Sequence, residues 1–325
     1  MIKSIKNICI RKINIGCVLG RKFFILANLL LFSTLGFGQP KTKSLLAQDN
    51  SVKEILQTVI STKQKLIRYE KSQGLDEKEL LFMAIFDFDD TILWGDCTEG
   101  KRDVNGSVIY KGLTQVCIEK GLSKQYKTFA PFWTKYTEME IADAPKAWIY
   151  AAQIFAGAKE SKILEVVANY YKSTLSNYFF QSAIEIISGF KKEGIVSSIV
   201  SGSPQVFLKG AAPYLQILPE NIHGMQTVVK DGILTDEAIY PLTTQEGKIE
   251  KIQLIIKEKL RDFKKVYILS GFGNNSLNDN PFIFWIADQE FPDGKPLGVM
   301  AYSPPRTKQK NISLVNMFEI TADKK

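Results

Sequence analysis

The residue types that could do chemistry in this chain gather first in residues 83–91, where three acidic side chains follow an apolar stretch. Side chains alternate along an extended chain, so Asp87 and Asp89 point to one side and Phe88 to the other. Two carboxylates held this close repel each other unless a cation lies between them, and Mg²⁺ accepts oxygen ligands of this kind. One carboxylate could then attack an electrophile while the other transfers a proton. A merely polar turn after a strand is the alternative interpretation of the same residues.

Two later segments place polar side chains where a strand ends or a helix begins. Ser201 and Gly202 follow a strand predicted over residues 195–200, and the end of such a strand is where an α/β sheet binds its ligand. Lys248 lies in the first turn of a helix predicted over residues 245–256, where it could reach a phosphate. Taken alone, this lysine is better explained as part of a solvated helix face.

The last such segment is a loop rich in glycine, amide and acidic residues. Residues 271–281 follow a strand predicted over residues 266–270 and precede a helix predicted over residues 282–287. The loop contains Asn275 and Asp279, which are both oxygen donors. All four segments therefore lie at successive strand ends and helix starts, where one folded site could collect them.

The elements that must position these residues predict an α/β fold. An amphipathic helix starting at Ser51 precedes the apolar strand at residues 83–86. From residue 181 onward, strands and helices alternate, which is typical of a parallel sheet covered by helices. Residues 223–235 resemble a β-hairpin and residues 298–302 a final strand. We therefore expect a Rossmann-like parallel sheet as the core.

Residues 92–180 differ from the rest, because helical patterns dominate and aromatic residues are dense. This composition predicts a mostly α-helical cap, inserted after the first strand and lying over the carboxylates. The aromatic side chains could form a cage for a quaternary ammonium group, although packing between helices explains them better. They include Phe129, Phe132, Trp133, Tyr136, Trp148 and Tyr150.

The order of the four segments resembles the motif order of the haloacid dehalogenase superfamily. The matching residues are Asp87-Phe88-Asp89-Asp90-Thr91, then Ser201, then Gly247-Lys248, then the loop from Asn275 to Asp279. The serine-containing strand end at residues 200–204 and the helical insertion look most like the phosphoserine-phosphatase-like branch. The resemblance covers about residues 83–303 and implies a Mg²⁺-dependent phosphatase. Such an enzyme hydrolyses a small organic phosphomonoester through an aspartyl-phosphate.

The same resemblance implies roles for the first motif. Asp87 would be the nucleophile that accepts the phosphoryl group, and it would also bind Mg²⁺. Asp89 would protonate the leaving oxygen and later activate water, with its main-chain carbonyl on the metal. Thr91 would hold the geometry of the loop. Phosphoryl transfer depends on positioning and charge neutralisation, which a metal ion and these groups supply.

The later motifs would bind the phosphoryl oxygens and complete the metal site. Ser201, Gly202 and Lys248 would contact the transferring group. Asp279 would orient Lys248 or a metal-bound water and is counted with the metal-binding residues. Because Lys248 would stabilise developing charge, we expect Lys248→Ala to lose activity measurably.

One position departs from the family pattern. The fourth motif usually begins Gly-Asp, and that aspartate binds Mg²⁺ directly. Here Asn275 takes the position if Asn278 and Asp279 are aligned to the pattern, whereas a one-residue insertion would give it to Asn274. An amide oxygen can coordinate Mg²⁺, but the loss of one negative charge predicts weaker binding.

Other functions stay open on the sequence alone. The missing aspartate would suit a catalytically weak or silent binding protein that kept the fold. Dehalogenation is disfavoured because dehalogenases lack the second aspartate that Asp89 provides. Phosphonate cleavage would need a special lysine of the cap, and no motif marks Lys111, Lys120 or Lys146 as one. The cap would select the ester, and its identity does not follow from the sequence.

The net charge of +8 does not indicate a nucleic-acid partner, because six positive charges and no acid lie in residues 1–38, which leaves +2 for the remainder. A basic segment followed by about 15 mostly apolar residues and small residues is typical of a secretory signal. We expect export to the periplasm or the medium, or membrane anchoring if this segment stays uncleaved. The oligomeric state does not follow from the sequence.

The predicted organisation is therefore a signal peptide or anchor over residues 1–38 and a linker over residues 39–50. Residues 51–91 and 181–325 form the α/β core around the cap. Cys97 and Cys117 remain after signal removal and could pair or be buried separately. His223 is the only histidine, which excludes paired-histidine metal sites and disfavours a Ser-His-Asp mechanism.

Overall fold

The computed structural model describes residues 44–301 and 312–315 of the chain, and those from Ala47 onward belong to one compact unit. The signal segment predicted over residues 1–38 and the start of the predicted linker lie outside the described residues. No helix in the described part combines the length and apolar character needed to cross a bilayer.

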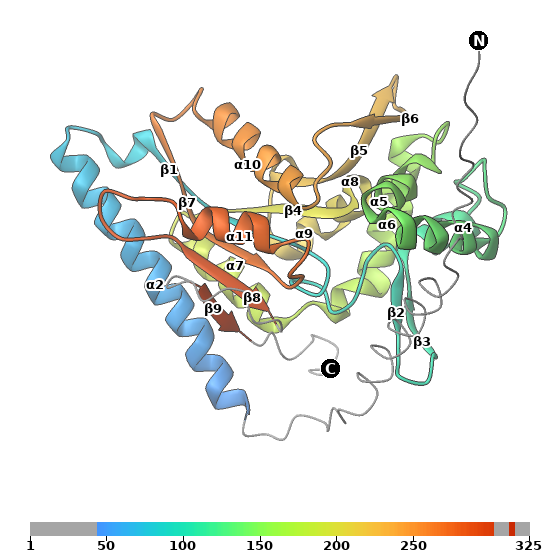
Figure 1. The fold of residues 1–325 in the computed structure, drawn as a ribbon, viewed down its shortest axis with the longest axis horizontal. Helices are drawn as coiled ribbons and strands as arrows, with labels where there is room; N and C mark the ends of the chain where they lie inside the picture. The colour runs from blue at the N-terminus through green and yellow to red at the C-terminus, as the bar shows by residue number, and fades with distance from the viewer. Residues whose placement is uncertain (1–43, 302–311, 316–325) are drawn as a thin grey trace, which may run out of the picture. The chain divides into compact units, whose positions relative to one another are not determined.

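A seven-stranded sheet organises the fold (Figure 1), with strand order β6-β5-β4-β1-β7-β8-β9. All neighbouring pairs are parallel except β5 and β6, which form the predicted hairpin. The parallel α/β core predicted from the sequence is thus confirmed. The strands are β1 (Leu80–Phe86), β4 (Val196–Pro204), β5 (Ile222–Lys230), β6 (Ile233–Ile239), β7 (Lys265–Gly273), β8 (Leu297–Ala301) and β9 (Ile312–Val315).

The central strand β1 is buried along its whole length because both faces of the sheet are covered. Phe82, Ala84 and Phe86 belong to one hydrophobic cluster, and the alternate residues, such as Met83 and Ile85, belong to a second. This alternation follows from the two-residue period of a strand. An uninterrupted apolar run was therefore the correct signal for a fully buried strand.

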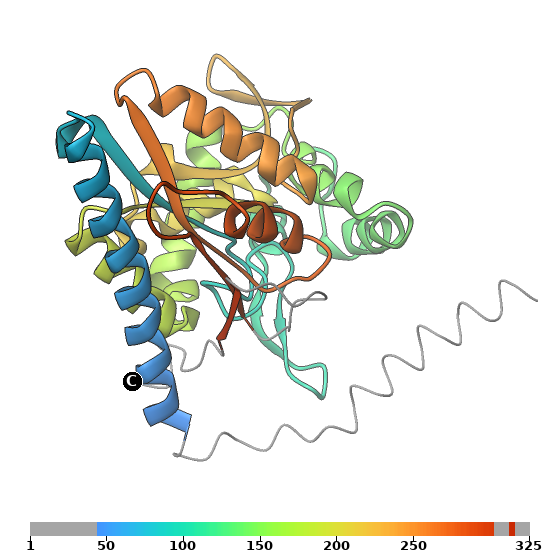
Figure 2. The same cartoon turned by 60° about the vertical axis from the view of Figure 1, so that its left-hand side comes forward.

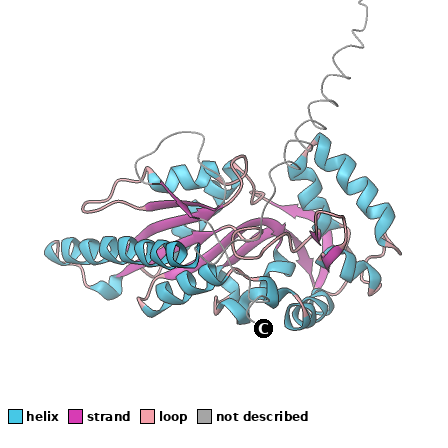
Figure 3. Cartoon of the chain, turned by 90° about the horizontal axis from the view of Figure 1, so that it is seen from below, coloured by secondary structure: helices cyan, strands magenta, loops and turns pink. Residues whose placement is uncertain are grey.

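Helices cover the two faces separately, and Figure 3 shows the strands as a layer between them. The first cluster includes buried residues of α2 and α7, and the second includes buried residues of α10 and α11. Close packing between α2 and α7 depends on Gly189, because a Cβ there would lie 2.6 Å from the Leu56 side chain. These helices are α2 (Ser44–Ser72), α7 (Gln181–Lys192), α10 (Glu246–Lys259) and α11 (Asn280–Ala287).

The insertion between β1 and α7 is mostly helical, as expected, but begins with a short antiparallel hairpin. In Figures 1 and 2 its green helices lie together at the end of the sheet far from α2. Its elements are β2 (Gly100–Arg102), β3 (Val108–Lys111), α3 (Leu113–Glu119), α4 (Phe129–Ala142), α5 (Ala144–Gln153), α6 (Glu160–Ser173) and the 3₁₀ turn η2 (Leu175–Tyr178). Most of the aromatic residues noted in the sequence pack within it.

The start of α2 differs from the prediction, and the structure decides whether Cys97 and Cys117 pair. The helix expected to start at Ser51 begins at Ser44, so the second half of the segment predicted as a linker is helical. Leu45, Leu46 and Ala47 are strong helix formers, which explains the longer helix. Cys97 and Cys117 are both buried and unpaired, so they act as small apolar side chains.

Candidate active site

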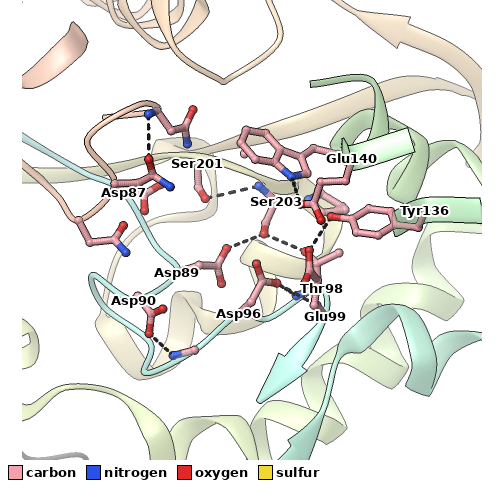
Figure 4. A pocket seen from close by; sticks show the side chains of 17 residues that line it. Asp87, Asp89, Asp90, Asp96, Thr98, Glu99, Tyr136, Glu140, Ser201 and Ser203 are labelled. Atoms are coloured by element: carbon pink, nitrogen blue, oxygen red, sulfur yellow. Dashed lines mark hydrogen bonds between the residues drawn. The ribbon is translucent and has the colours of Figure 1, made fainter. Parts of the chain in front are cut away.

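A pocket of about 280 Å³ opens where β1, β4 and β7 end, beneath the cap (Figure 4). Three core segments, the cap segment 95–99 and two cap helices contribute to it, so residues far apart in the sequence share one surface. The lining residues are Asp87, Asp89, Asp90, Gly95, Asp96, Thr98, Glu99, Tyr136, Glu140, Trp148, Ser201, Gly202, Ser203, Pro204, Asn274, Asn275 and Asn278. The structure therefore brings the motif residues together at the edge of the sheet that the sequence predicted.

Lys248 connects the first and fourth motifs directly behind the pocket. Its Nζ atom lies 2.7 Å from Asp87 Oδ1 and 2.6 Å from Asp279 Oδ1. All three side chains are buried, and the ammonium also lies 5.3 Å from the centre of the Phe282 ring. Lys248 is thus a structural cation of the site, and the reading of it as part of a solvated face is wrong.

Asp279 holds both Lys248 and its own loop in place. Its Oδ2 atom accepts hydrogen bonds from the main-chain N–H groups of Asn274 and Asn275, while Oδ1 binds Lys248. Gly273 allows this approach, because a Cβ there would lie 2.6 Å from Asp279 Cβ. The geometry assigns Asp279 to the orientation of Lys248 and of its own loop. Its predicted contact with a metal stays a prediction.

A second polar contact fixes the start of α10, which carries Lys248. Asn278 Oδ1 accepts hydrogen bonds from the Thr244 hydroxyl at 2.7 Å and from the Gln245 N–H at 2.9 Å. Gln245 has a positive φ of 48°, a strained conformation for a residue with a side chain. The strained turn directs the first turn of the helix, and with it Lys248, toward Asp87.

Asp89 lies in a network that joins the first motif, the end of β4 and the cap. Its Oδ2 atom accepts a 2.6 Å hydrogen bond from the Ser203 hydroxyl, and Oδ1 accepts one from the Cys97 N–H. The Thr98 hydroxyl lies 2.8 Å from that of Ser203. Neither Thr98 nor Ser203 was predicted as a site residue, although Ser203 belongs to the serine-rich strand end that the sequence singled out.

Asn274 fits the position of the missing fourth-motif aspartate better than Asn275 does. Thr91 Oγ1 lies 3.4 Å from Asn274 Oδ1 and 3.5 Å from Asp87 Oδ2, so these two oxygens face the same hydroxyl. In contrast, Asn275 Oδ1 accepts hydrogen bonds from the N–H groups of Leu277 and Asn278 within its loop. The sequence predicted Asn275 as the metal ligand, with Asn274 as the alternative, and the geometry favours Asn274.

Burial raises the pKa of both first-motif aspartates. Burial and the charge of Asp279 raise the pKa of Asp87 to about 6, against the lowering effect of Lys248. Burial, with the charges of Asp96 and Asp87, raises the pKa of Asp89 well above its usual range. A carboxyl group that keeps its proton near neutral pH is suited to act as a general acid.

The donor set around Asp87 fits Mg²⁺ in chemical type. Carboxylate, amide and main-chain carbonyl oxygens are the ligands that this ion prefers, and Asp87 Oδ2 and Asn274 Oδ1 converge on one hydroxyl. Within the described residues, no three side chains of His, Cys, Asp or Glu are grouped to hold a metal. A metal at this place would thus depend on amide and carbonyl oxygens beside the aspartates.

The cap contributes acids that the sequence did not identify as site residues. Glu99 Oε1 accepts a 2.8 Å hydrogen bond from the Tyr136 hydroxyl, and Glu140 Oε1 accepts one of 3.0 Å from Trp148 Nε1. Asp96 lies with them on the pocket wall. The only signal for them in the sequence was the closeness of Asp96 and Glu99 to the first motif.

A comparison with solved structures finds several proteins to which this chain is similar. A structure of a protein with unknown function from Bordetella pertussis Tohama I shares 13% identity with a TM-score of 0.56, over 74% of this chain and all of that one. A substrate-bound phosphoserine phosphatase shares 16% identity with a TM-score of 0.43, over 77% of this chain and 97% of that one. A cytosolic 5'-nucleotidase IIIB bound to cytidine shares 14% identity with a TM-score of 0.47, over 69% and 73%.

No curated protein sequence matches the chain significantly. The profile of the haloacid dehalogenase-like hydrolases, in contrast, matches residues 84–274, which is more than half of the chain. The matched region begins within β1 and ends in the loop that carries Asn274, so it spans the elements that build the pocket. The chain therefore belongs to the haloacid dehalogenase-like hydrolases.

Proposed function

We propose that this hydrolase is a phosphomonoesterase that works through an aspartyl-phosphate on Asp87. The observation that carries the proposal is the ion pair of 2.7 Å between Asp87 and Lys248, at the base of a pocket that also exposes Asp89, Ser201 and Gly202. A carboxylate beside a fixed cation, with a second acid close by, provides a nucleophile, charge stabilisation and a proton donor. These are the requirements of phosphoryl transfer.

The residues divide the reaction into two steps. An oxygen of Asp87 attacks the phosphorus, the bond from phosphorus to the alcohol oxygen breaks, and protonated Asp89 gives its proton to that oxygen. Water then attacks the phosphorus of the acyl phosphate, Asp89 takes the proton, and phosphate leaves with the Asp87 carboxylate restored. Ser201 and Lys248 stabilise the phosphoryl oxygens. Mg²⁺, held by Asp87, Asn274 and the carbonyl of Asp89, would supply further charge neutralisation.

A silent binding protein is the second candidate function, and the amide at the fourth-motif position favours it. Without that carboxylate, the site offers Mg²⁺ one negative charge less. This candidate predicts that a phosphate ester binds but is not hydrolysed, with or without Mg²⁺. The two candidates thus differ in turnover and not in fold.

The decisive experiment compares residues 40–325 with their Asp87→Asn variant on a panel of phosphomonoesters. We expect phosphate release that needs Mg²⁺, is lost with a chelator, and is absent in the variant. Asp262→Asn changes an exposed acid on another part of the surface and should keep full activity. Thermal unfolding checks that the Asp87 variant folds. Unchanged turnover in that variant would refute the proposal, and binding without turnover in the unaltered protein would favour the second candidate.

We also propose that the protein is exported, on the basis of the basic and apolar pattern of residues 1–38. Cell fractionation of the full chain, with sequencing of the mature N-terminus, tests export and cleavage together. A product that stays in the cytoplasm with an intact N-terminus would refute it.

A further inference from the structure

The cap side of the pocket is rich in carboxyl groups. In Figure 4, Asp87 lies on one side of the pocket and Tyr136, Glu99 and Glu140 on the other. Six carboxylates line the pocket in all, and none of its lining residues is Lys, Arg or His. A phosphate ester that enters must therefore tolerate negative potential well beyond the reacting phosphoryl group.

Two of the cap acids are positioned by aromatic side chains and not by basic residues. Tyr136 donates to one oxygen of Glu99, and Trp148 donates to one oxygen of Glu140. Among the described residues, neither glutamate forms an ion pair, and neither does Asp96. The second oxygen of each glutamate is the acceptor that the protein leaves for another donor.

The nearby lysines, Lys248 and Lys101, contact other acids and not those of the cap wall. Lys248 is fully buried between Asp87 and Asp279. Lys101 lies 3.7 Å from Asp90 and over the Trp94 ring, outside the pocket lining. No lining side chain can therefore neutralise the cap acids once they are ionised, and a cationic ligand would supply the compensating charge that carboxylates need when they lose water.

Trp148 connects this anionic wall to the phosphate side of the pocket. A Cβ at Gly202 would lie 3.2 Å from Cε3 of the indole, so the ring packs directly on the main chain of the phosphate-binding segment. Its Nε1 holds Glu140 from the other side. A cation bound between the indole, Tyr136 and the two glutamates would thus lie beside the segment that carries Ser201 and Gly202. A short alkyl chain could then join this cation to the phosphoryl group.

We propose that the substrate is a monophosphate ester of a short alcohol that carries an ammonium or trimethylammonium group and no carboxylate. The proposal rests on the proposed function of this pocket and specifies its substrate class. The cation binds between Glu99, Glu140 and the aromatic rings, which combine charge attraction with cation–π contact. A substrate carboxylate finds no basic partner there and meets the three cap acids instead.

Matched esters test the charge separately from size. The kcat/KM for phosphocholine is compared with that for 3,3-dimethylbutyl phosphate, which has the same shape without the charge. Phosphoethanolamine and phosphoserine differ from each other by the carboxylate. We expect the charged member of the first pair to be preferred at least about tenfold, and phosphoethanolamine to be preferred over phosphoserine. The ratio between phosphocholine and phosphoethanolamine distinguishes a quaternary from a primary ammonium site.

A double variant, Glu99→Gln with Glu140→Gln, tests the residues. We expect the ratio of phosphocholine to its neutral analogue to fall toward one. The matched control is Glu138→Gln, because Glu138 is an exposed acid that lies on α4 with Glu140 but outside the pocket. This variant should keep the preference for phosphocholine over its neutral analogue. Equal or better hydrolysis of the neutral ester by the unaltered protein overturns the inference, while loss of both activities in Asp87→Asn leaves the proposed function standing.

Binding measurements keep the test informative if no ester is hydrolysed. Calorimetric titration with phosphocholine and with 3,3-dimethylbutyl phosphate then reports the charge preference directly. Tighter binding of the charged ester supports the inference although the proposed function has failed. Equal binding of the two esters, or tighter binding of phosphoserine than of phosphoethanolamine, overturns it.

Discussion

Ser203 donates a hydrogen bond of 2.6 Å from its hydroxyl to Oδ2 of Asp89, the residue assigned as acid and base. The Thr98 hydroxyl lies 2.8 Å from the same oxygen of Ser203, and both hydroxyls are buried. One strand end therefore holds this carboxyl through Ser203, and the cap segment holds Ser203 through Thr98. In the proposed reaction, Ser203 would act by positioning Asp89.

Ser203→Ala should lower kcat by about tenfold or more, because a hydrogen bond to a charged group contributes about 1.5–3 kcal/mol. Loss of this bond also removes a contact that lowers the pKa of Asp89, so the pKa rises further and the pH profile shifts upward. The measurement is kcat against pH for both proteins. Ser203→Thr keeps a hydroxyl and should restore much of the profile. An alanine variant with an unaltered profile would show that Ser203 is only a packing residue.

Lys248→Ala should cost both activity and stability. Removal of the ammonium leaves Asp87 and Asp279 facing each other without a cation, and breaking a buried ion pair costs about 3–5 kcal/mol. The variant should regain stability as the pH falls and Asp87, whose pKa is already raised to about 6, becomes protonated. Urea unfolding at pH 7 and pH 5 measures both effects. The exposed Lys257→Ala on the same helix is the control, expected within about 0.5 kcal/mol of the unaltered protein.

Asn274→Asp should strengthen Mg²⁺ binding by about tenfold or more, equivalent to about 1.4 kcal/mol, because it restores a negative charge beside Asp87 Oδ2. Asn275→Asp is the matched comparison, because its Oδ1 already binds the N–H groups of Leu277 and Asn278. Mg²⁺ titration of activity, together with calorimetry, gives the dissociation constants. A larger gain from the change at position 275 would return the ligand position to that residue.

The preference for cationic esters should increase with pH. Burial, with the charges of Asp96 and Glu140, raises the pKa of Glu99 to about 8, while Tyr136 donates to it. Glu99 is thus protonated below this pH and gains its charge above it, so KM for phosphocholine should fall from pH 6.5 to 8.5. Dividing by KM for the neutral analogue cancels titration of the phosphate. Glu99→Gln should flatten the ratio, and a flat ratio in the unaltered protein would contradict the prediction.

Local sequence was sufficient for the elements and for the residues that follow β1 directly. Asp87 and Asp89 could be identified because an apolar run, a two-residue period and adjacent acids occur together in one short segment. The roles of Asn274 and Asn275 could not be separated in this way. They depend on which amide turns toward Thr91 and which turns back to its own loop.

The cap acids could not be predicted from the sequence for a different reason. Glu140 and Trp148 lie on successive helices, and only the packing of α4 against α5 turns both toward the pocket. From the sequence alone, packing between helices was the better explanation of Tyr136 and Trp148. The structure shows that each also uses its polar atom to hold an acid.

The cap leaves and re-enters the core through two adjacent segments. Leu93 pairs with Phe179, and main-chain hydrogen bonds join Trp94 to Tyr178 and Phe180 to Ile92 at 2.8 and 2.9 Å. The ends of an insertion of more than eighty residues are therefore neighbours, and β1 before it and α7 after it need not shift to accommodate it. Because both ends are tied at one place, changes of length or sequence inside the insertion can leave the position of Asp87 and Asp89 at the end of β1 unaltered.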